Sequence, residues 1–486
     1  MSLNGATPLG HMRHTSGEQL PKSVPLSRDC ATIRTERAGA WDFAERWCAV
    51  FARRIVVVGT GYVGLTTGAC LASLGHRVVC SDVDAAKVAA LARGEVRILE
   101  PGLAELVGEG LAAGRLEFAV GSAAAVAEAE VVFLCVPTPM GSGGAADLAA
   151  VESVVAEVGE LLPAGCVLVC KSTVPVGTSA RVAELVGRAD VAVVSNPEFL
   201  REGSAVHDFL NPDRIVVGSD SQDAAERVAA LYARLGAPTV LTDAASAEMV
   251  KYAANCFLAT KLSYVNAVAE LCERLGADIA DVTEGMGFDR RIGQSFLQPG
   301  PGWGGSCLPK DTAALMRVAE SVEFEFGLLR ETIAANARQR ERMVDKVAEA
   351  CGVGAGASLR GVRLGLLGLT FKAGTDDLRD SPAMAVAGLL AARGAELVAY
   401  DPGLRGDEPG VAELVTLVDD PYQAAKGAAG LVVLTEWQEF RTVDWTRVAG
   451  LLEGPVVVDT RNHLDPDVLR RAGLSWRGVG RTPVTP

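Results

Sequence analysis

The sequence has few positive charges for its length. It contains 46 lysine and arginine residues against 60 aspartate and glutamate residues, which gives a net charge of −14. A protein that binds nucleic acid would show a basic patch or stripe, so this composition argues against that class of partner. An acidic chain can still hold an anionic ligand, but only through a few well-placed cations and helix N-termini.

The eleven cysteines lack the spacing of a zinc site. Their number is odd, no C-x-x-C pair occurs, and most lie inside apolar runs such as VVFLCV and CVLVCK. This usage is typical of buried thiols in a reducing compartment. We therefore expect a cytoplasmic protein without a bound metal.

The chain also lacks a recognisable signal peptide or membrane span. Residues 1–50 contain no apolar core segment, and the apolar run at 55–75 is rich in glycine, which favours a strand, a turn and a helix. We expect no membrane association. We expect residues 1–52 to be a poorly ordered N-terminal extension, in which the first eleven residues could be an expression tag before a second start at Met12.

The rest of the chain shows two patterns of hydrophobic periodicity. Short apolar runs alternate with helical segments over residues 53–243 and again over 356–486, which predicts parallel sheets. Residues 244–275 hold no Gly or Pro and predict one long helix, which could be a spine between domains or a dimer seam. We predict an α/β protein with two Rossmann-like, doubly wound domains, joined by this helix and a helical domain over 244–355.

The apolar run RIVVV at 54–58 predicts a buried parallel strand, and a G-x-G-x-x-G pattern follows it and opens a helix. Gly59, Gly61 and Gly64 would let the backbone approach a pyrophosphate, and Asp82 at the end of the next strand would bond ribose hydroxyls. The glycine pattern alone is a weak signal, but strand, helix and acid are all in place. Because an acid here would repel a 2′-phosphate, the pattern favours NAD over NADP.

The segment GWGGSCLPKDT at 302–312 places a cysteine among glycines and just before a proline. Glycines before Cys307 disfavour a helix, and Pro309 blocks one just after it. A packing cysteine normally lies inside an apolar helix or strand. We therefore expect a tight loop with an exposed backbone and a thiol at its tip.

Seven motifs in order resemble the UDP-glucose 6-dehydrogenase family, within the UDP-glucose/GDP-mannose dehydrogenases. They are GTGYVG, CVPTP, KSTVPVGT, NPEFLREG, AEMVKYAAN, FLQPGPGWGGSCLPKD and FKAGTDDLRDSP. That family oxidises C6 of a nucleotide sugar from alcohol to carboxylate, reduces two NAD⁺ and uses a covalent cysteine. The resemblance implies four-electron oxidation of UDP-glucose to UDP-glucuronate.

The resemblance assigns catalytic roles to single residues. Cys307 would attack the C6 aldehyde to give a thiohemiacetal, whose oxidation yields a thioester that water cleaves. We expect nearby cations and a helix N-terminus to lower its pKa. Lys251 and Asn255, one helical turn apart, would contact C6 and stabilise an oxyanion. Asp311 would move a proton or position water.

Acid and base roles differ between family members, and we expect Glu198 to act as an acid or base while Glu202 and Thr173 hold a water. The residues expected around NAD are Gly59, Gly61, Tyr62, Val63, Gly64, Asp82, Lys87, Pro137, Thr138, Thr173, Glu202, Lys310 and Arg379. The residues expected around the nucleotide sugar are Glu198, Phe199, Leu200, Arg201, Glu202, Lys251, Asn255, Phe296, Leu297, Gly300, Gly304, Lys372 and Arg461. Arg461 would reach the diphosphate across a homodimer or a higher homo-oligomer.

Other readings remain open. The same chemistry could act on dTDP-glucose, because uracil and thymine differ by one methyl group. Burial of that group in an apolar pocket contributes only about 1 kcal/mol to the binding free energy. Loop details make GDP-mannose and UDP-N-acetylhexosamine less favoured, while Trp303, where the family more often has Tyr or Phe, leaves the base preference open. A two-electron β-hydroxyacid dehydrogenase would not need Cys307, and a non-catalytic sensor would have lost the thiol or Lys251.

Overall fold

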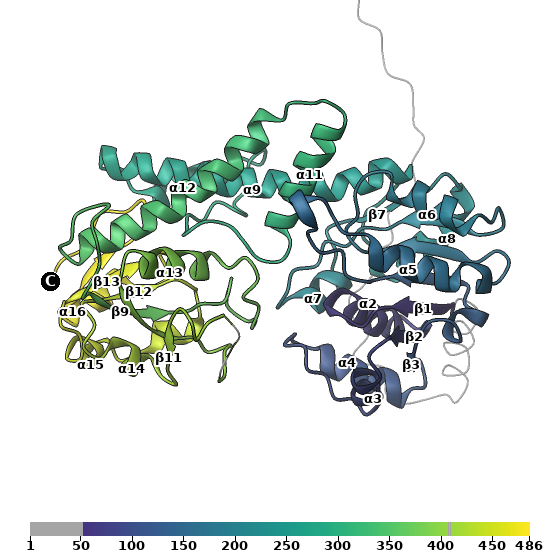
Figure 1. Ribbon diagram of the computed structural model, residues 1–486, viewed down its shortest axis with the longest axis horizontal. Coiled ribbons are helices and arrows are strands. Elements are labelled where there is room, and N and C mark those ends of the chain that lie inside the picture. The colour runs from purple at the N-terminus through teal and green to yellow at the C-terminus, as the bar shows by residue number, and fades with distance from the viewer. Residues whose placement is uncertain (1–51, 407, 409) are drawn as a thin grey trace, which may run out of the picture. The chain divides into compact units, whose positions relative to one another are not determined.

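Residues 52–406, 408 and 410–486 are described by a computed structural model (Figure 1). The extension predicted over residues 1–52 lies outside this part of the chain, apart from Ala52. Within the described ranges, no helix combines the length and the apolar character needed to cross a membrane. In chain order, the secondary structure forms one sheet, a set of long helices and a second sheet.

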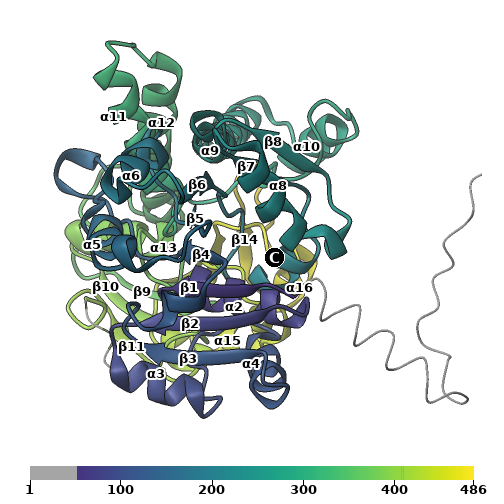
Figure 2. The same cartoon turned by 90° about the vertical axis from the view of Figure 1, so that its right-hand side faces the viewer.

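The N-terminal sheet has its strands in the order β3-β2-β1-β4-β5-β6-β7-β8. Figure 2 shows this order from β3 at the bottom to β8 at the top. Neighbouring strands are parallel except β6 and β7. The strands are β1 (Arg54–Val58), β2 (Arg77–Asp82), β3 (Leu116–Val120), β4 (Val131–Leu134), β5 (Val167–Cys170), β6 (Ala192–Ser195), β7 (Ile215–Gly218) and β8 (Thr239–Thr242).

Two hydrophobic cores cover the opposite faces of this sheet. Ile55 and Val57 join one core, whereas Val56 and Val58 join the other, because side chains alternate along a strand. The first core includes side chains of α2, α4, α7 and α8, and the second includes side chains of α5 and α6. The helices are α2 (Tyr62–Ser73), α3 (Ala85–Ala92), α4 (Leu103–Ala112), α5 (Ala149–Val158), α6 (Thr178–Val186), α7 (Ala205–Leu210) and α8 (Gln222–Leu231).

The C-terminal sheet is parallel throughout, in the order β11-β10-β9-β12-β13-β14. Its strands are β9 (Arg363–Leu367), β10 (Glu396–Tyr400), β11 (Thr416–Leu417), β12 (Gly430–Val433), β13 (Val456–Asp459) and β14 (Ser475–Arg477), and its helices are α13 (Pro382–Ala392), α14 (Pro421–Ala425), α15 (Trp445–Ala449) and α16 (Pro466–Arg471). The strand order reverses between β1 and β4 in the first sheet and between β9 and β12 in the second. Ligands of doubly wound sheets bind at such switch points.

The helices between the sheets are built around α9 (Ala244–Leu275). The Asp243 side chain accepts a hydrogen bond from the Ser246 N–H at its start, and Gly276 ends it in a left-handed conformation. α9 packs against α11 (Leu308–Ser321) and α12 (Gly327–Ala350), and α10 (Ile279–Gly287) follows it in the chain. The predicted fold class is confirmed, and the predicted strand at 54–58 and helix at 244–275 have the observed bounds.

Candidate active site

The glycine loop after β1 leaves room for a ligand at the start of α2. Gly59 has a φ of 95°, and a Cβ there would lie 2.7 Å from the carbonyl oxygen of Cys135. A Cβ on Gly64 would overlap the carbonyl of Gly59. A Cβ on Gly61 would meet nothing within 4 Å, and no side chain caps α2. The open space and the uncapped N–H groups therefore fit the pyrophosphate of a dinucleotide.

Asp82 closes the other side of this loop. Its Oδ2 accepts hydrogen bonds from the Thr60 N–H at 3.0 Å, the Thr60 hydroxyl at 2.5 Å and the Lys87 ammonium at 3.0 Å. Its Oδ1 accepts one from the Asp84 N–H at 3.1 Å. Burial raises the pKa of Asp82, but these donors together hold it well below its usual range. The carboxylate is therefore ionised, and it could accept hydrogen bonds from ribose hydroxyls.

The cysteine loop is packed rather than exposed, so the expected exposed backbone is wrong. A Cβ on Gly304 would overlap the carbonyl of Asp380, and a Cβ on Gly305 would lie 2.8 Å from the Phe371 ring. The indole N–H of buried Trp303 donates to the Ser263 hydroxyl at 2.8 Å. Cys307 is partly buried and is the N-cap residue of α11. The glycines thus allow close packing against the segment that follows β9.

Two buried pairs connect α9 to the surroundings of the thiol. The Lys251 ammonium donates to Oε1 of Glu198 at 2.8 Å, and the Asn255 amide donates to Oδ2 of Asp311 at 2.6 Å. The Lys310 ammonium binds the other oxygen of Asp311 at 2.6 Å. One face of α9 therefore holds the carboxylates of two distant segments, as expected for residues at i and i+4.

The charges around Cys307 do not favour a thiolate, so the expected fall of its pKa is wrong. Burial raises the pKa of the Cys307 thiol, and the carboxylates of Glu198 and Asp311 raise it further, while the Lys251 ammonium and the Ser306 hydroxyl lower it less. Lys251 is countered by Glu198, with which it is paired. The thiol is therefore protonated at neutral pH in this form and needs a base to become a nucleophile.

Glu198 and Lys251 form a charged pair despite their burial. Burial raises the pKa of Glu198, but the Lys251 ammonium, the Leu200 N–H and the Lys171 ammonium together outweigh it, so the net pKa is lowered. Burial lowers the pKa of Lys251, but Glu198, Cys307 and Asp311 together outweigh it, so the net pKa is raised. The second oxygen of Glu198 accepts from the Leu200 N–H at 2.6 Å, so both carboxylate oxygens have partners.

Glu202 has a different environment. Its Oε1 accepts from the Ser306 hydroxyl at 3.3 Å and the Arg379 guanidinium at 3.0 Å, and its buried Oε2 has no hydrogen-bond partner among the described residues. Burial and the nearby carboxylate of Asp377 raise the pKa of Glu202 to about 7. A carboxylate with this pKa suits proton transfer at neutral pH.

Ser306 and Asp377 were missed in the sequence. Ser306 adjoins Cys307, and its hydroxyl lies 3.7 Å from the sulfur. Asp377 accepts from the Arg379 guanidinium at 2.7 Å. Both lie inside motifs that the sequence analysis identified. The available signals were that Ser306 adjoins Cys307 and that Asp377 lies two residues before Arg379.

Contacts from the C-terminal sheet also reach this region. Arg461 donates to the carbonyls of Leu434 at 2.9 Å and Phe371 at 3.2 Å, and its guanidinium is 3.5 Å from the place of a Cβ on Gly300. Arg461 thus packs against carbonyls of its own chain, and its expected reach across a dimer stays a prediction. The Lys372 ammonium is 5.3 Å from the centroid of the Phe371 ring.

The remaining expected residues lie on the connecting loops. The Thr138 hydroxyl donates to the carbonyl of Thr173 at 2.8 Å, which joins the loop containing Pro137 to the KSTVPVGT loop. Among the described contacts, none joins the Thr173 side chain to Cys307. The hydroxyl of Tyr62, next to Val63 in α2, lies 2.8 Å from Oε2 of Glu100 and 2.7 Å from the carbonyl of Arg201.

The loop that precedes the cysteine segment is fixed to the helices. Phe296 has a φ of 61°, which is unusual for a side chain of this size. Leu297 is buried, and the Gly300 N–H donates to the Asn266 side chain at 2.8 Å. The backbone of this loop is therefore held in place before any ligand binds.

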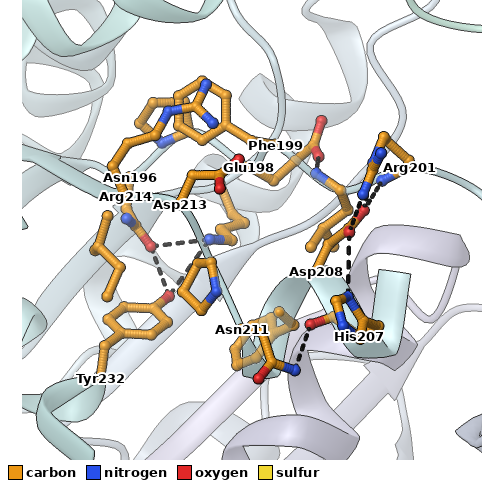
Figure 3. A pocket seen from close by; sticks show the side chains of 16 residues that line it. Asn196, Glu198, Phe199, Arg201, His207, Asp208, Asn211, Asp213, Arg214 and Tyr232 are labelled. Carbon is orange, nitrogen blue, oxygen red and sulfur yellow. Dashed lines mark hydrogen bonds and ion pairs between the residues drawn. The ribbon is translucent and has the colours of Figure 1, made fainter. Parts of the chain in front are cut away.

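A cavity of about 160 Å³ adjoins the Glu198–Arg201 segment (Figure 3). Arg214 stacks on the Phe199 ring with its guanidinium carbon 3.6 Å from the ring centroid. The buried ammonium of Lys171 donates to the Asn196 side chain at 3.0 Å. Cys307 is not among the residues that line this cavity.

Comparison with known proteins identifies the family. Three family models cover most of the chain: the NAD binding domain matches residues 53–236, the central domain 245–338 and the UDP binding domain 365–466. The chain belongs to the UDP-glucose/GDP-mannose dehydrogenase family. It is an NAD-dependent nucleotide-sugar dehydrogenase, which confirms the family and cofactor expected from the motifs.

Relatives cover nearly the whole described chain. The UDP-glucose 6-dehydrogenase of Rhizobium meliloti is 44% identical over 438 residues, which span 88% of this chain and 99% of that one. The UDP-glucose 6-dehydrogenase of Pseudomonas aeruginosa is 43% identical over 88% of this chain and 97% of that one. A solved structure of a UDP-glucose dehydrogenase from Pyrobaculum islandicum is 38% identical with a TM-score of 0.80, and the match covers 89% of this chain and 98% of that one.

Proposed function

We propose that this dehydrogenase oxidises UDP-glucose at C6 to UDP-glucuronate, with Cys307 holding the carbon between two oxidations. The observation that carries the proposal is the convergence of Cys307 with the Lys251–Glu198 and Asn255–Asp311 pairs at the start of α11. The relatives named UDP-glucose 6-dehydrogenase support the choice of substrate. A two-electron dehydrogenase would not need the thiol.

When bound, NAD⁺ accepts a hydride from C6, and two molecules of it are consumed for each carboxylate formed. The residues of the first glycine loop and Asp82 would hold it. In the chain itself, Lys251 keeps its proton because Glu198 raises its pKa. Its ammonium and the Asn255 amide are therefore donors that stabilise negative charge on the C6 oxygen, rather than bases.

The thiol would add to the C6 aldehyde and form a thiohemiacetal. Oxidation of that adduct gives a thioester, and water cleaves it to release the carboxylate and the thiol. Glu202 is the carboxylate whose pKa of about 7 suits activation of that water. Glu198 is fully paired, so we propose that it fixes Lys251 in place.

The substrate is tested by initial rates with UDP-glucose, dTDP-glucose, GDP-mannose and UDP-N-acetylglucosamine at equal concentrations. We expect the highest kcat/KM with UDP-glucose. Trp303 is buried and bonded to Ser263, so its departure from the family pattern is a packing change. Faster turnover of any other nucleotide sugar would contradict the assignment of UDP-glucose.

We also propose that the protein is a cytoplasmic homodimer that pairs through α9. This helix exposes a stripe of large apolar side chains spaced four to eight residues apart, which lie on one face: Met249, Phe257, Tyr264, Leu271 and Leu275. Phe257 is 67% exposed, and Val322, the residue that follows α11, is 69% exposed. We expect Phe257→Glu to give a monomer in sedimentation analysis while Val322→Glu does not. A wild-type monomer, or identical behaviour of both variants, would contradict this pairing.

A further inference from the structure

The thiol of Cys307 is joined to Glu202 by one side chain. The Ser306 hydroxyl lies 3.7 Å from the sulfur of Cys307 and 3.3 Å from Oε1 of Glu202. The hydroxyl can accept a proton from the sulfur while it donates its own to the carboxylate. The thiol is protonated and Glu202 is buried, so this short path links an acid that must lose a proton to a group that can take one.

We propose that Ser306 is a catalytic residue that passes the thiol proton of Cys307 to Glu202, and that Asp377 is a positioning residue that sets when Glu202 can accept it. The proposal rests on the proposed role of Cys307 as nucleophile. As the sulfur attacks carbon, its S–H bond breaks and the proton goes to Oγ of Ser306. The proton of Ser306 goes to Oε1 of Glu202. The C=O electron pair of the aldehyde moves onto the C6 oxygen, to which Lys251 and Asn255 donate. A thiol, an aldehyde and a carboxylate thus become a thiohemiacetal oxyanion and a carboxylic acid, and Glu202 releases this proton to solvent before it acts on water.

Asp377 acts on Glu202 directly, and the two carboxylates also share the Arg379 guanidinium. One guanidinium nitrogen of Arg379 lies 3.0 Å from Oε1 of Glu202 and 2.7 Å from Oδ2 of Asp377. The side chains of Glu202 and Asp377 are only 14% and 9% exposed. Two buried carboxylates that share one cation cannot both ionise freely, and one of them holds a proton more tightly.

The direction of this coupling is clear. Burial and Asp377 raise the pKa of Glu202, whereas Arg379 and Ser306 lower it. Removal of the Asp377 charge should therefore lower the pKa of Glu202 and extend its ionised form to more acidic pH. The titratable or charged groups that face Glu202 are Asp377, Arg379 and Lys372 from the segment after β9, and Tyr62 from α2.

The test is the pH dependence of alkylation of Cys307 by iodoacetamide in the full ligand-free chain. The modified Cys307 peptide is quantified by mass spectrometry, so the other cysteines do not interfere. In the wild type we expect the rate to rise with an inflection near pH 7, the pKa of Glu202. We expect Ser306→Ala to lower the rate at pH 7.5 by about tenfold or more and Ser306→Thr, which keeps the hydroxyl, to restore it.

Asp377→Asn has a matched control in Asp376→Asn, because Asp376 is the exposed neighbour of Asp377. We expect Asp377→Asn to move the inflection to lower pH by about one unit, while Asp376→Asn leaves it unchanged. A purely structural role of Asp377 would change the rate at every pH without moving the inflection. Circular dichroism confirms that each variant is folded.

Two results would overturn the proposal. One is a rate that climbs steadily to pH 9 with no inflection near pH 7, which means that only free thiolate reacts. The other is a Ser306→Ala profile identical to that of the wild type. Alkylation needs neither NAD nor a sugar, so failure here is distinguishable from failure of the UDP-glucose assay.

Discussion

The two sheets share one turn after their first strand but use it differently. Gly59 follows β1 with a φ of 95°, and Gly368 follows β9 with a φ of 91°. Each donates its N–H at 2.8 Å to a carbonyl of the neighbouring strand, Ser81 in one sheet and Tyr400 in the other. An aspartate, Asp82 or Asp401, then binds the backbone just after the glycine.

The two sheets differ in the segment that comes after this turn. In the N-terminal sheet α2 begins at Tyr62 without a side-chain cap, so its N–H groups remain free for an anion. In the C-terminal sheet the chain continues to Ser381, whose hydroxyl caps α13 by accepting from the N–H groups of Ala383 and Met384. The closed helix end cannot hold a pyrophosphate in the same way. The added segment instead carries Asp377 and Arg379 to Glu202.

The largest effect is expected where α9 meets the N-terminal sheet. Lys251→Met leaves the buried carboxylate of Glu198 without its cation. We expect kcat to fall at least about 100-fold and the free energy of unfolding to fall by about 3–5 kcal/mol. Steady-state kinetics and urea denaturation measure the two effects.

A second variant separates the two roles of that pair. Lys251→Met combined with Glu198→Gln removes the unpaired charge, so stability should recover while kcat stays low. If the double variant recovers activity, Lys251 has no role beyond the ion pair.

The next largest effect is expected at the uncapped start of α2, where Gly61 lies. Gly61→Ala adds a methyl group to empty space, so we expect the fold to stay stable while KM for NAD rises about 100-fold. Gly108→Ala, in the middle of α4 and also without neighbours, is the matched control. Equal KM values for the two variants would mean that the space above Gly61 does not hold the cofactor.

The smallest effect is expected when Asp401 and Asp82, the aspartates that bind the two glycine turns, are compared. Asp401 is 2% exposed and accepts from the N–H groups of Leu369, Thr370 and Gly403. We expect Asp401→Asn to cost about 2 kcal/mol of stability and to leave KM for NAD unchanged. We expect Asp82→Asn to act chiefly on KM for NAD. A rise in that KM with Asp401→Asn would show that the closed turn also affects cofactor binding.

Several elements in this comparison could be predicted from the sequence, because local sequence patterns determine them. The apolar run at 54–58 predicted the strand, and the absence of Gly and Pro over 244–275 predicted the helix. The glycine pattern predicted the turn after β1, and its role with Asp82 in cofactor binding stays a prediction. Each depends on residues close together in the chain, where periodicity and turn chemistry act.

The electrostatics of the thiol could not be read in the same way. The pKa of Cys307 depends on Glu198, Lys251 and Asp311, which come from three segments that meet only in the fold. The packing of the cysteine loop depends on Asp380 and Phe371, more than sixty positions further along the chain. Motifs show which residues take part, but distances decide their protonation.

The most direct test of the account is the amount of NADH formed per UDP-glucose consumed, for the wild type and Cys307→Ser. We expect two NADH per sugar in the wild type, and in the variant a loss of carboxylate formation with at most one NADH per sugar. One NADH per sugar in the wild type, unaffected by loss of the thiol, would contradict the four-electron mechanism and leave a simple alcohol dehydrogenase.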